Sequence, residues 1–321
     1  MMKVGVIGVG YLGRFHAQKY ASMQDVELLY VCDISEKRGE EVAKETGSRF
    51  IKDYREIASE VDAVSIVVPT NQHFEIAKYF LEAGVHCLVE KPITEHLYEA
   101  EALIEIAKEK GCILQVGHLE RFNPAIRFLE DHVEKPLFIE AHRLSGFKER
   151  ALDVDVILDL MIHDIDLTLA FVNSEIKEIR AVGVPVLSPK IDIANARIMF
   201  ENGCNANLTA SRISLQTMRR IRIFQPGLYL SADCLEQSNL MVTADLERPP
   251  TEAIVPRPIS HERSDILMDE LMHFVDCIKN GVKPKVAGED GLKALEVAQQ
   301  IKAKIQEGLG VYEECIGKKS F

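Results

Sequence analysis

The 321-residue chain is 47% hydrophobic and 27% charged, which excludes a disordered protein and favours two folded domains. Its formal net charge of −12 excludes a general affinity for nucleic acid or anionic membranes, because long-range repulsion opposes both. Seven scattered cysteines without CxxC spacing predict neither a disulfide framework nor a metal site, and without a leader-like start or a long apolar run we expect a soluble, cytoplasmic protein.

The first 120 residues alternate short β-branched runs with amphipathic stretches, a rhythm typical of parallel strands joined by helices. Because the strands read as continuous apolar runs, we expect a Rossmann-type doubly wound α/β domain with helices on both faces of the sheet. Strands are predicted at 3–8, 26–33, 63–69, 86–92 and 112–117, and helices at 13–23, 35–47, 73–84 and 97–111.

Residues 121–321 follow a different pattern, which predicts an α+β substrate and oligomerisation domain with an open, mainly antiparallel sheet. A proline-rich stretch at 247–261 is expected to be an extended loop. The final helix, about 289–307, is expected to be able to pack back on the first domain. One helix is predicted at 156–172, β-rich segments at 178–187, 193–200, 204–214, 220–233 and 239–245, and closing helices at 265–281 and 291–308.

Gly8, Gly10 and Gly13 have GxGxxG spacing between the first strand and the first helix. This arrangement suits a dinucleotide, since glycines permit the tight turn and the close approach of the pyrophosphate to a helix N-terminus. Asp33 ends the second strand, where a carboxylate accepts hydrogen bonds from the adenosine ribose and repels a 2′-phosphate. NAD is therefore favoured over NADP, although Lys37 and Arg38 follow closely and leave NADP as the alternative to their being surface charges.

The EKP triplet Glu90, Lys91 and Pro92 ends another predicted parallel strand. Open α/β sheets bind ligands at the carboxyl ends of their strands, so Lys91 is a candidate catalytic residue. The alternative is a solvated lysine in a turn. Pro92 can form a cis bond with Lys91.

The stretch DLMIHDIDL places Asp159, His163 and Asp166 on one face of the helix predicted at 156–172, among apolar neighbours. Buried ionisable groups are costly unless they are paired, and a carboxylate that orients a histidine makes it a general base near neutral pH. A structural histidine held by aspartates, or a pair of metal ligands, are the alternatives at this point.

These three motifs together resemble the glucose-fructose oxidoreductase, inositol dehydrogenase and MocA (Gfo/Idh/MocA) family, over essentially the full chain. The resemblance implies a Rossmann domain, a second domain whose open sheet builds homodimers or homotetramers, and NAD(P)-linked oxidation of a sugar or polyol hydroxyl. It implies catalytic roles for Lys91, Asp159 and His163. The cofactor contacts that it implies are Gly8, Gly10, Tyr11, Leu12, Gly13, Asp33, Pro69, Thr70, Asn71, His73, Glu90 and Lys91.

Met161 stands where the family usually carries glycine between the aspartate and the histidine. The segments GHLERFNPA and DLMIHDIDL resemble the narrower branch of the family that oxidises the 3-hydroxyl of UDP-N-acetylglucosamine to a ketone, which is later aminated for lipid A. That resemblance implies substrate contacts from His118, Arg121, Asn123 and Arg212. Arg212, Arg219, Arg220 and Arg222 lie in one basic segment that suits a diphosphate or, alternatively, an exposed or intersubunit sheet face.

The mechanism that we expect has His163, oriented by Asp159, remove the hydroxyl proton while Lys91 donates a hydrogen bond to the same oxygen and hydride leaves to the nicotinamide. Lys91 and His163 can exchange these roles. Two other functions remain open: a dehydrogenase of a free polyol such as an inositol, and a dinucleotide-binding regulator without catalysis. The joint presence of Lys91, Asp159 and His163 favours an enzyme.

Overall fold

The computed structural model describes residues 1–147, 154–244 and 254–316, with side chains up to residue 311. The chain forms two compact units, each with its own apolar core. The first unit comprises Met1–Phe122 and Asp265–Lys293, and the second comprises Asn123–Ser264 and Ala294–Phe321. Among the helices of the described residues, none combines the length and the hydropathy needed to cross a membrane.

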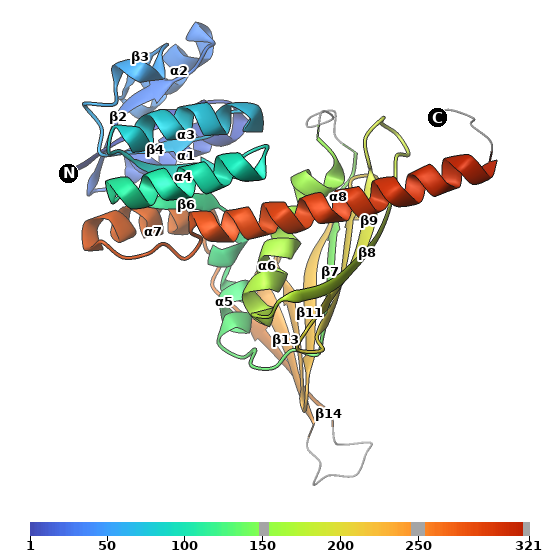
Figure 1. Ribbon diagram of the computed structural model, residues 1–321. Coiled ribbons are helices and arrows are strands. Elements are labelled where there is room, and N and C mark those ends of the chain that lie inside the picture. Colours follow the sequence, from blue (N-terminus) through green and yellow to red (C-terminus); the bar gives the residue numbers. More distant parts are fainter. Residues whose placement is uncertain (148–153, 245–253, 317–321) are drawn as a thin grey trace. The chain divides into compact units, whose positions relative to one another are not determined.

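A six-stranded parallel sheet forms the centre of the first unit (Figure 1), in the order β3-β2-β1-β4-β5-β6. The order of strands reverses between β1 and β4, and doubly wound sheets bind ligands beside the carboxyl ends of strands at such a point. The strands are β1 (Met2–Ile7), β2 (Val26–Cys32), β3 (Arg49–Ile51), β4 (Ala63–Ile66), β5 (His86–Glu90) and β6 (Leu114–Gly117).

Helices connect these strands and cover the sheet. The interior strand β4 is buried throughout because both of its faces are covered, as its continuous apolar sequence predicts. Short 3₁₀ turns follow three of the strands: η1 (Tyr54–Glu56), η2 (Thr70–Gln72) and η3 (Leu119–Phe122). The helices are α1 (Tyr11–Ser22), α2 (Glu36–Thr46), α3 (His73–Glu82), α4 (Leu97–Lys110) and α7 (Ile266–Asn280), which packs against α1.

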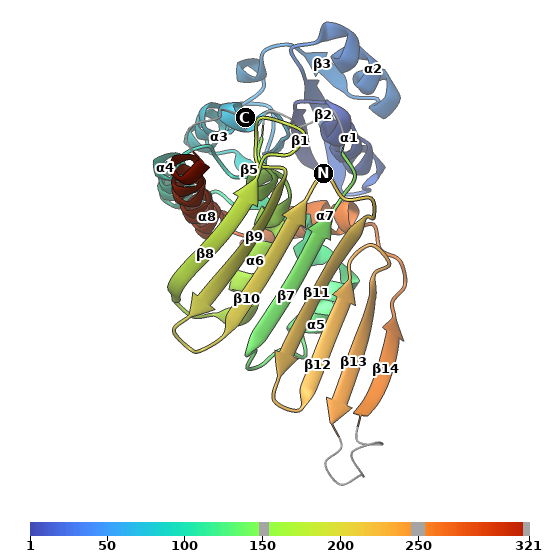
Figure 2. The same cartoon turned by 90° about the vertical axis from the view of Figure 1, so that its right-hand side faces the viewer.

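The second unit contains an eight-stranded sheet (Figure 2), in the order β14-β13-β12-β11-β7-β10-β9-β8. Only the pairing of β7 with β10 is parallel among these strands. This mixed, mostly antiparallel sheet confirms the predicted fold class. The strands are β7 (Phe138–Leu144), β8 (Ile176–Val184), β9 (Ile193–Phe200), β10 (Asn205–Ser211), β11 (Met218–Gln225), β12 (Leu228–Asp233), β13 (Ser238–Ala244) and β14 (Ile254–Ser260).

One face of this sheet packs against helices, and the core of the second unit lies between them. The alternation of buried and half-exposed residues along β7 and β10 reflects this one-sided cover. In Figure 2 the other face is turned to the viewer. The covering helices are α5 (Pro124–Glu130), α6 (Ile162–Val172) and, from Ala294 onward, α8 (Gly288–Ile316).

The proline-rich stretch corrects one prediction. Residues 254–260 form β14 rather than an extended loop, whereas 247–253 lie outside the described residues. β14 is an edge strand that pairs only with β13. Because Pro256 and Pro258 are two residues apart, both nitrogens face the same side of the strand, so an edge strand tolerates them without losing ladder hydrogen bonds.

The predicted helix at 156–172 is also different in detail. Its first turn, η4 (Ile157–Met161), is a π-helix, and regular α-helix begins at Ile162. Asp155 caps this turn, since its side chain accepts a hydrogen bond from the Leu158 amide at 3.0 Å. A π turn is wider than an α turn, so strict four-residue spacing does not describe the geometry between Asp159 and His163.

Candidate functional site

The glycine turn between β1 and α1 admits no other residue at two positions. Gly8 has a φ of +84°, and a Cβ there would lie 2.5 Å from the carbonyl oxygen of Val67. A Cβ on Gly13 would lie 1.8 Å from the carbonyl oxygen of Gly8. At Gly10, by contrast, an added Cβ would meet only the guanidinium of Arg38, at 3.7 Å. Two glycines thus shape the turn, and Gly10 leaves space beside it.

The N-terminus of α1 offers a site for an anion. Gly10 is the N-cap, and within the described residues no side chain caps the helix and no acidic residue lies in its first turn. The first amides of a helix lack partners in the helix and carry partial positive charge. Tyr11, Leu12 and Gly13 supply these amides, so a pyrophosphate fits here.

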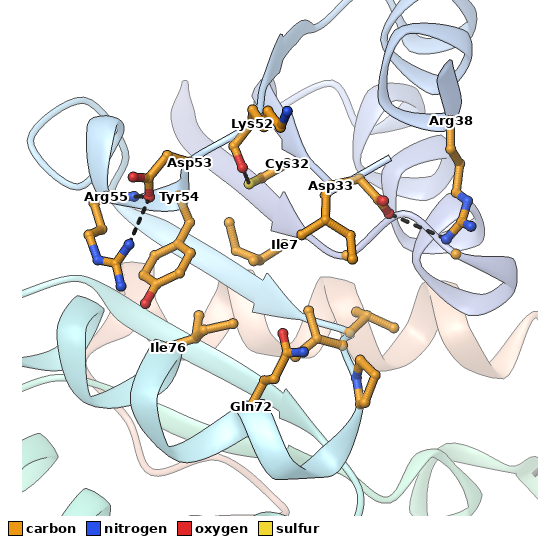
Figure 3. A pocket seen from close by; sticks show the side chains of 16 residues that line it. Ile7, Cys32, Asp33, Arg38, Lys52, Asp53, Tyr54, Arg55, Gln72 and Ile76 are labelled. Atoms are coloured by element: carbon orange, nitrogen blue, oxygen red, sulfur yellow. Dashed lines mark hydrogen bonds and ion pairs between the residues drawn. The ribbon is translucent and has the colours of Figure 1, made fainter. Parts of the chain in front are cut away.

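Next to this turn lies a cavity of about 540 Å³ (Figure 3), lined by the ends of β1, β2 and β4. Asp33 is on its wall and is almost fully buried. The Asp33 carboxylate accepts hydrogen bonds from the amides of Val9 at 3.0 Å and Ser35 at 2.8 Å, which fix its position. Arg38 extends from α2 to within 3.6 Å of the same carboxylate.

These residues fit the adenosine half of a dinucleotide. The anchored carboxylate of Asp33 is a hydrogen-bond acceptor for ribose hydroxyls, and the apolar side chains of Ile7 and Ile76 line the same cavity. NAD, when bound, would supply the hydride acceptor. The sequence predicted Asp33 but treated Arg38 as a surface charge or as an NADP contact, and it gave no signal for Lys52 and Tyr54 on the opposite wall.

The loop after β4 is fastened from within by His73. Its ring nitrogens lie 2.9 Å from the carbonyl oxygens of Pro92 and Val68, which connects this loop to the turn after β5. Burial lowers the pKa of His73, although these hydrogen bonds oppose the shift. Pro69 lines the cavity, and Thr70 and Asn71 form part of η2 nearby, with Asn71 exposed.

Lys91 follows β5 directly, at the carboxyl edge of the parallel sheet. Its bond to Pro92 is cis, as the sequence allowed. Lys91 is partly exposed, whereas the Glu90 side chain is buried and accepts a hydrogen bond from the Lys91 amide at 3.3 Å. Glu90 and His73 thus hold the backbone of the short turn that carries Lys91.

The segment after β6 carries three of the predicted substrate contacts, and all three residues are buried. His118 and Arg121 are buried at η3 in the first unit. Asn123 begins the second unit, where it caps α5 through the Ala125 amide and donates to the Cys234 carbonyl at 3.0 Å. The Asn123 amide therefore has a structural use in this arrangement, and its contact with substrate stays a prediction.

In the second unit, Asp159 lies on the π turn and His163 on the first turn of α6, both half-exposed. Asp164 and Asp166 are buried. Asp164 forms a two-pronged ion pair with the guanidinium of Arg143 on β7, with its shortest contact at 2.7 Å. One aspartate of the sequence motif is therefore a packing partner, and this pairing was not predicted.

Three arginines of the basic segment form ion pairs with different acidic residues. Arg212 is buried and pairs with Asp192 at 2.8 Å, and its other nitrogens donate to the Val154 carbonyl and the Ser188 hydroxyl. Arg220 and Arg222 pair across the sheet with Asp233 and Glu140. Substrate contact by Arg212 stays a prediction, and a structural function for it is already in place.

Two family models match the chain. Residues 2–118 match the Gfo/Idh/MocA oxidoreductase family with an NAD-binding Rossmann fold, and residues 126–225 match the Gfo/Idh/MocA C-terminal domain. The chain belongs to the Gfo/Idh/MocA family. It is therefore an oxidoreductase with an NAD-binding Rossmann domain, as its motifs predicted.

Relatives within the Gfo/Idh/MocA family are similar over nearly the full chain. UDP-N-acetylglucosamine 3-dehydrogenase of Acidithiobacillus ferrooxidans is 41% identical, over 95% of this chain and 97% of its own length. Its solved structure matches with a TM-score of 0.91, covering 95% of this chain and 98% of that one at 40% identity. Myo-inositol 2-dehydrogenase of Thermotoga maritima is 28% identical, over 98% of this chain and 100% of its own length.

Proposed function

We propose that this protein is an NAD-dependent dehydrogenase that oxidises the 3-hydroxyl of UDP-N-acetylglucosamine to a ketone. The observation that carries the proposal is the 41% identity to the Acidithiobacillus enzyme over 95% of the chain. Myo-inositol 2-dehydrogenase, at 28% identity, makes a free polyol the second candidate substrate.

In this proposal Lys91 of the first unit and His163 of the second unit act on one substrate hydroxyl. His163, oriented by Asp159, accepts the hydroxyl proton as general base. Lys91 donates a hydrogen bond to the same oxygen and stabilises the negative charge that develops there. Support comes from the position of Lys91 at the carboxyl edge of the parallel sheet and from the partial exposure of the residue His163. These features also favour an enzyme over a dinucleotide-binding regulator, which needs neither side chain.

NAD rather than NADP is the proposed cofactor. The Asp33 carboxylate is held by two backbone amides and cannot turn away from a 2′-phosphate without losing them. Arg38 lies beside it, but its charge is already offset by Asp33 at 3.6 Å. A 2′-phosphate would therefore meet a fixed negative charge, whereas a 2′-hydroxyl finds an acceptor.

We further propose that two or four copies associate through the uncovered face of the eight-stranded sheet. Phe138, Phe224 and Tyr229 lie on that face as neighbours, with ring centroids 5.6 Å and 4.9 Å apart. Aromatic side chains are enriched at protein interfaces, and a cluster across three strands suits a second copy of the same chain.

Deuterium transfer tests the reaction and its position together. UDP-N-acetylglucosamine labelled at C3 is expected to deliver its deuterium to the nicotinamide of NAD, whereas the same sugar labelled at C2 is expected to deliver none. Myo-inositol serves as the competing substrate in parallel. Reduction of NAD by myo-inositol but not by the nucleotide sugar would replace the proposal with its second candidate, and no reduction by either would favour a binding protein.

A further inference from the structure

Three ionisable side chains lie inside the first unit, and none of them lines the cofactor cavity. They are His16 on α1, Glu90 at the end of β5, and Glu270 on α7, and all are buried. Nε2 of His16 lies 3.3 Å from a carboxylate oxygen of Glu90. The side-chain amide of Gln115 on β6 donates a hydrogen bond to the backbone carbonyl oxygen of Glu270 at 3.3 Å. This bond holds α7 against the sheet.

The sheet leaves space for this cluster. Glu90 pairs with Gly117 of β6, and a Cβ on Gly117 would lie 2.9 Å from the Glu90 carboxylate. Both carboxylate oxygens of Glu270 and both ring nitrogens of His16 are buried. Among the described residues, none forms a hydrogen bond of good geometry with these four atoms. Buried polar atoms are nearly always hydrogen-bonded, so these groups must satisfy one another directly or through enclosed water.

The electrostatics distinguish the two carboxyl groups. Burial favours a neutral Glu90, but the hydrogen bond and charge of His16, then the charges of Lys91 and His73, outweigh it and lower the pKa of Glu90. Burial, followed by the negative charge of Glu90, raises the pKa of Glu270 well above its ordinary value. Tyr20 of α1 stays a neutral phenol because burial raises its pKa, although the hydrogen bond between its hydroxyl and that of Ser65, at 2.9 Å, opposes the shift.

We propose that Glu270 is a positioning residue for Lys91: as a neutral acid between α7 and the sheet, it donates a hydrogen bond into the His16 and Glu90 pair. This bond keeps Glu90 an anion at the base of the turn that carries Lys91. Two ionised carboxylates in one buried space would repel each other strongly, whereas one neutral acid stabilises the other as an anion. The catalytic part of the inference rests on the function proposed for Lys91, but the protonation of Glu270 does not.

Stability against pH tests the protonation. Glu270 keeps its proton in the folded protein and loses it when the chain unfolds, so its contribution to stability falls as pH rises above the unfolded pKa of about 4.3. Glu270→Gln cannot titrate. Between that pH and the folded pKa, the unfolding constant of the unaltered protein is expected to rise relative to that of Glu270→Gln by up to about tenfold per pH unit.

The matched control is Asp276→Asn, which removes an exposed carboxyl from the same helix. Its unfolding constant is expected to keep a constant ratio to that of the unaltered protein between about pH 5 and pH 8, the pH range in which proteins are usually most stable. Infrared spectroscopy of the unaltered protein at neutral pH is expected to show the carbonyl band of a buried carboxylic acid. A constant ratio for Glu270→Gln, or the absence of that band, would overturn the proposal.

The positioning effect needs a second comparison, between Glu270→Gln and Glu270→Leu. Gln still donates a hydrogen bond, so we expect turnover and its pH profile to stay near those of the unaltered enzyme. Leu cannot donate, so kcat is expected to fall about tenfold, with the KM for NAD unchanged. The basic limb of its pH profile is expected to move to lower pH. Without the donated hydrogen bond the ionised form of Glu90 is less favoured, so Glu90 stabilises the Lys91 ammonium less.

A purely structural Glu270 would lower stability in the Leu variant without moving the pH profile, which would refute the positioning function. Lys91→Ala separates this outcome from a failure of the proposed mechanism. Full turnover in Lys91→Ala would remove the catalytic function of Lys91 while the titration of Glu270 stands. Loss of turnover in Lys91→Ala with an unmoved profile in Glu270→Leu would remove only the inference about Glu270.

Discussion

At the scale of single residues, replacement of Lys91 or His163 should separate chemistry from cofactor binding. Lys91→Ala and His163→Ala are each expected to lower kcat about a hundredfold or more, because each loses a proton acceptor or a charge-stabilising donor. Fluorescence titration should show NAD binding within a few-fold of the unaltered enzyme. Lys37→Ala, on the exposed face of α2, is the control and should keep full turnover. Normal kcat in both active-site variants would contradict the assignment.

Asp33 is expected to set the preference between the two dinucleotides. Asp33→Asn keeps one oxygen to accept from Val9 or Ser35, but it removes the negative charge beside Arg38. The KM for NAD should rise about tenfold, since a hydrogen bond from the ribose to a charged acceptor is lost. The KM for NADP should fall, because Arg38 becomes available to the 2′-phosphate. Steady-state kinetics with both cofactors measures this change, and an unchanged ratio of the two KM values would refute the explanation.

For single residues, the sequence predicted local motifs but not contacts between segments that are distant along the chain. Gly13 and Asp33 lie at fixed offsets within one βαβ unit, so their spacing alone predicted the turn and the carboxylate beside the cavity. His16, Glu90 and Glu270 come from three separate elements. No spacing rule connects them, because only folding brings α7 against the sheet.

At the scale of elements, the turn between β1 and α1 should be the least tolerant to substitution. Gly13→Ala places a Cβ 1.8 Å from the Gly8 carbonyl oxygen, so helix and turn must move apart. We expect NAD affinity to fall at least about a hundredfold, the scale of a misplaced positioning element. Calorimetric titration with NAD measures this loss, with circular dichroism to establish that the variant folds.

Gly308→Ala is the matched control in α8, where an added Cβ meets nothing within 4 Å. Alanine loses less conformational freedom than glycine in a helix, so this variant should be more stable by about 0.5–1 kcal/mol, with unchanged NAD affinity. Unchanged NAD affinity in Gly13→Ala would contradict the steric account of the turn.

Elements with a strong period were predicted, and those governed by tertiary partners were not. The helices α2 and α4 end at Gly47 and Gly111, as their sequences indicated. The strands β3, β7 and β14 were missed. β3 has only three residues, β7 carries Glu140, His142 and Arg143 among its seven residues, and the prolines of β14 resemble a loop although β13 pairs with it. The π turn before α6 was also unpredictable, because its residues read as ordinary helix.

At the scale of the whole molecule, association of copies is the prediction that the sheet makes. Phe224→Asp puts a charge in the cluster with Phe138 and Tyr229 on the uncovered face. Analytical ultracentrifugation is expected to give two or four times 36.1 kDa for the unaltered protein and 36.1 kDa for the variant. Val282→Asp, at an exposed site in the first unit, should leave the mass unchanged. A monomeric unaltered protein would refute the interface.

The account depends most on two side chains from separate units that act on one alcohol. A crystal structure of the complex with NADH and UDP-N-acetylglucosamine tests this most directly. We expect Nζ of Lys91 and a ring nitrogen of His163 each to lie about 3 Å from the oxygen at C3 of the sugar, a hydrogen-bond distance. A structure in which either nitrogen contacts a different part of the substrate, or faces a different cavity, would contradict the account.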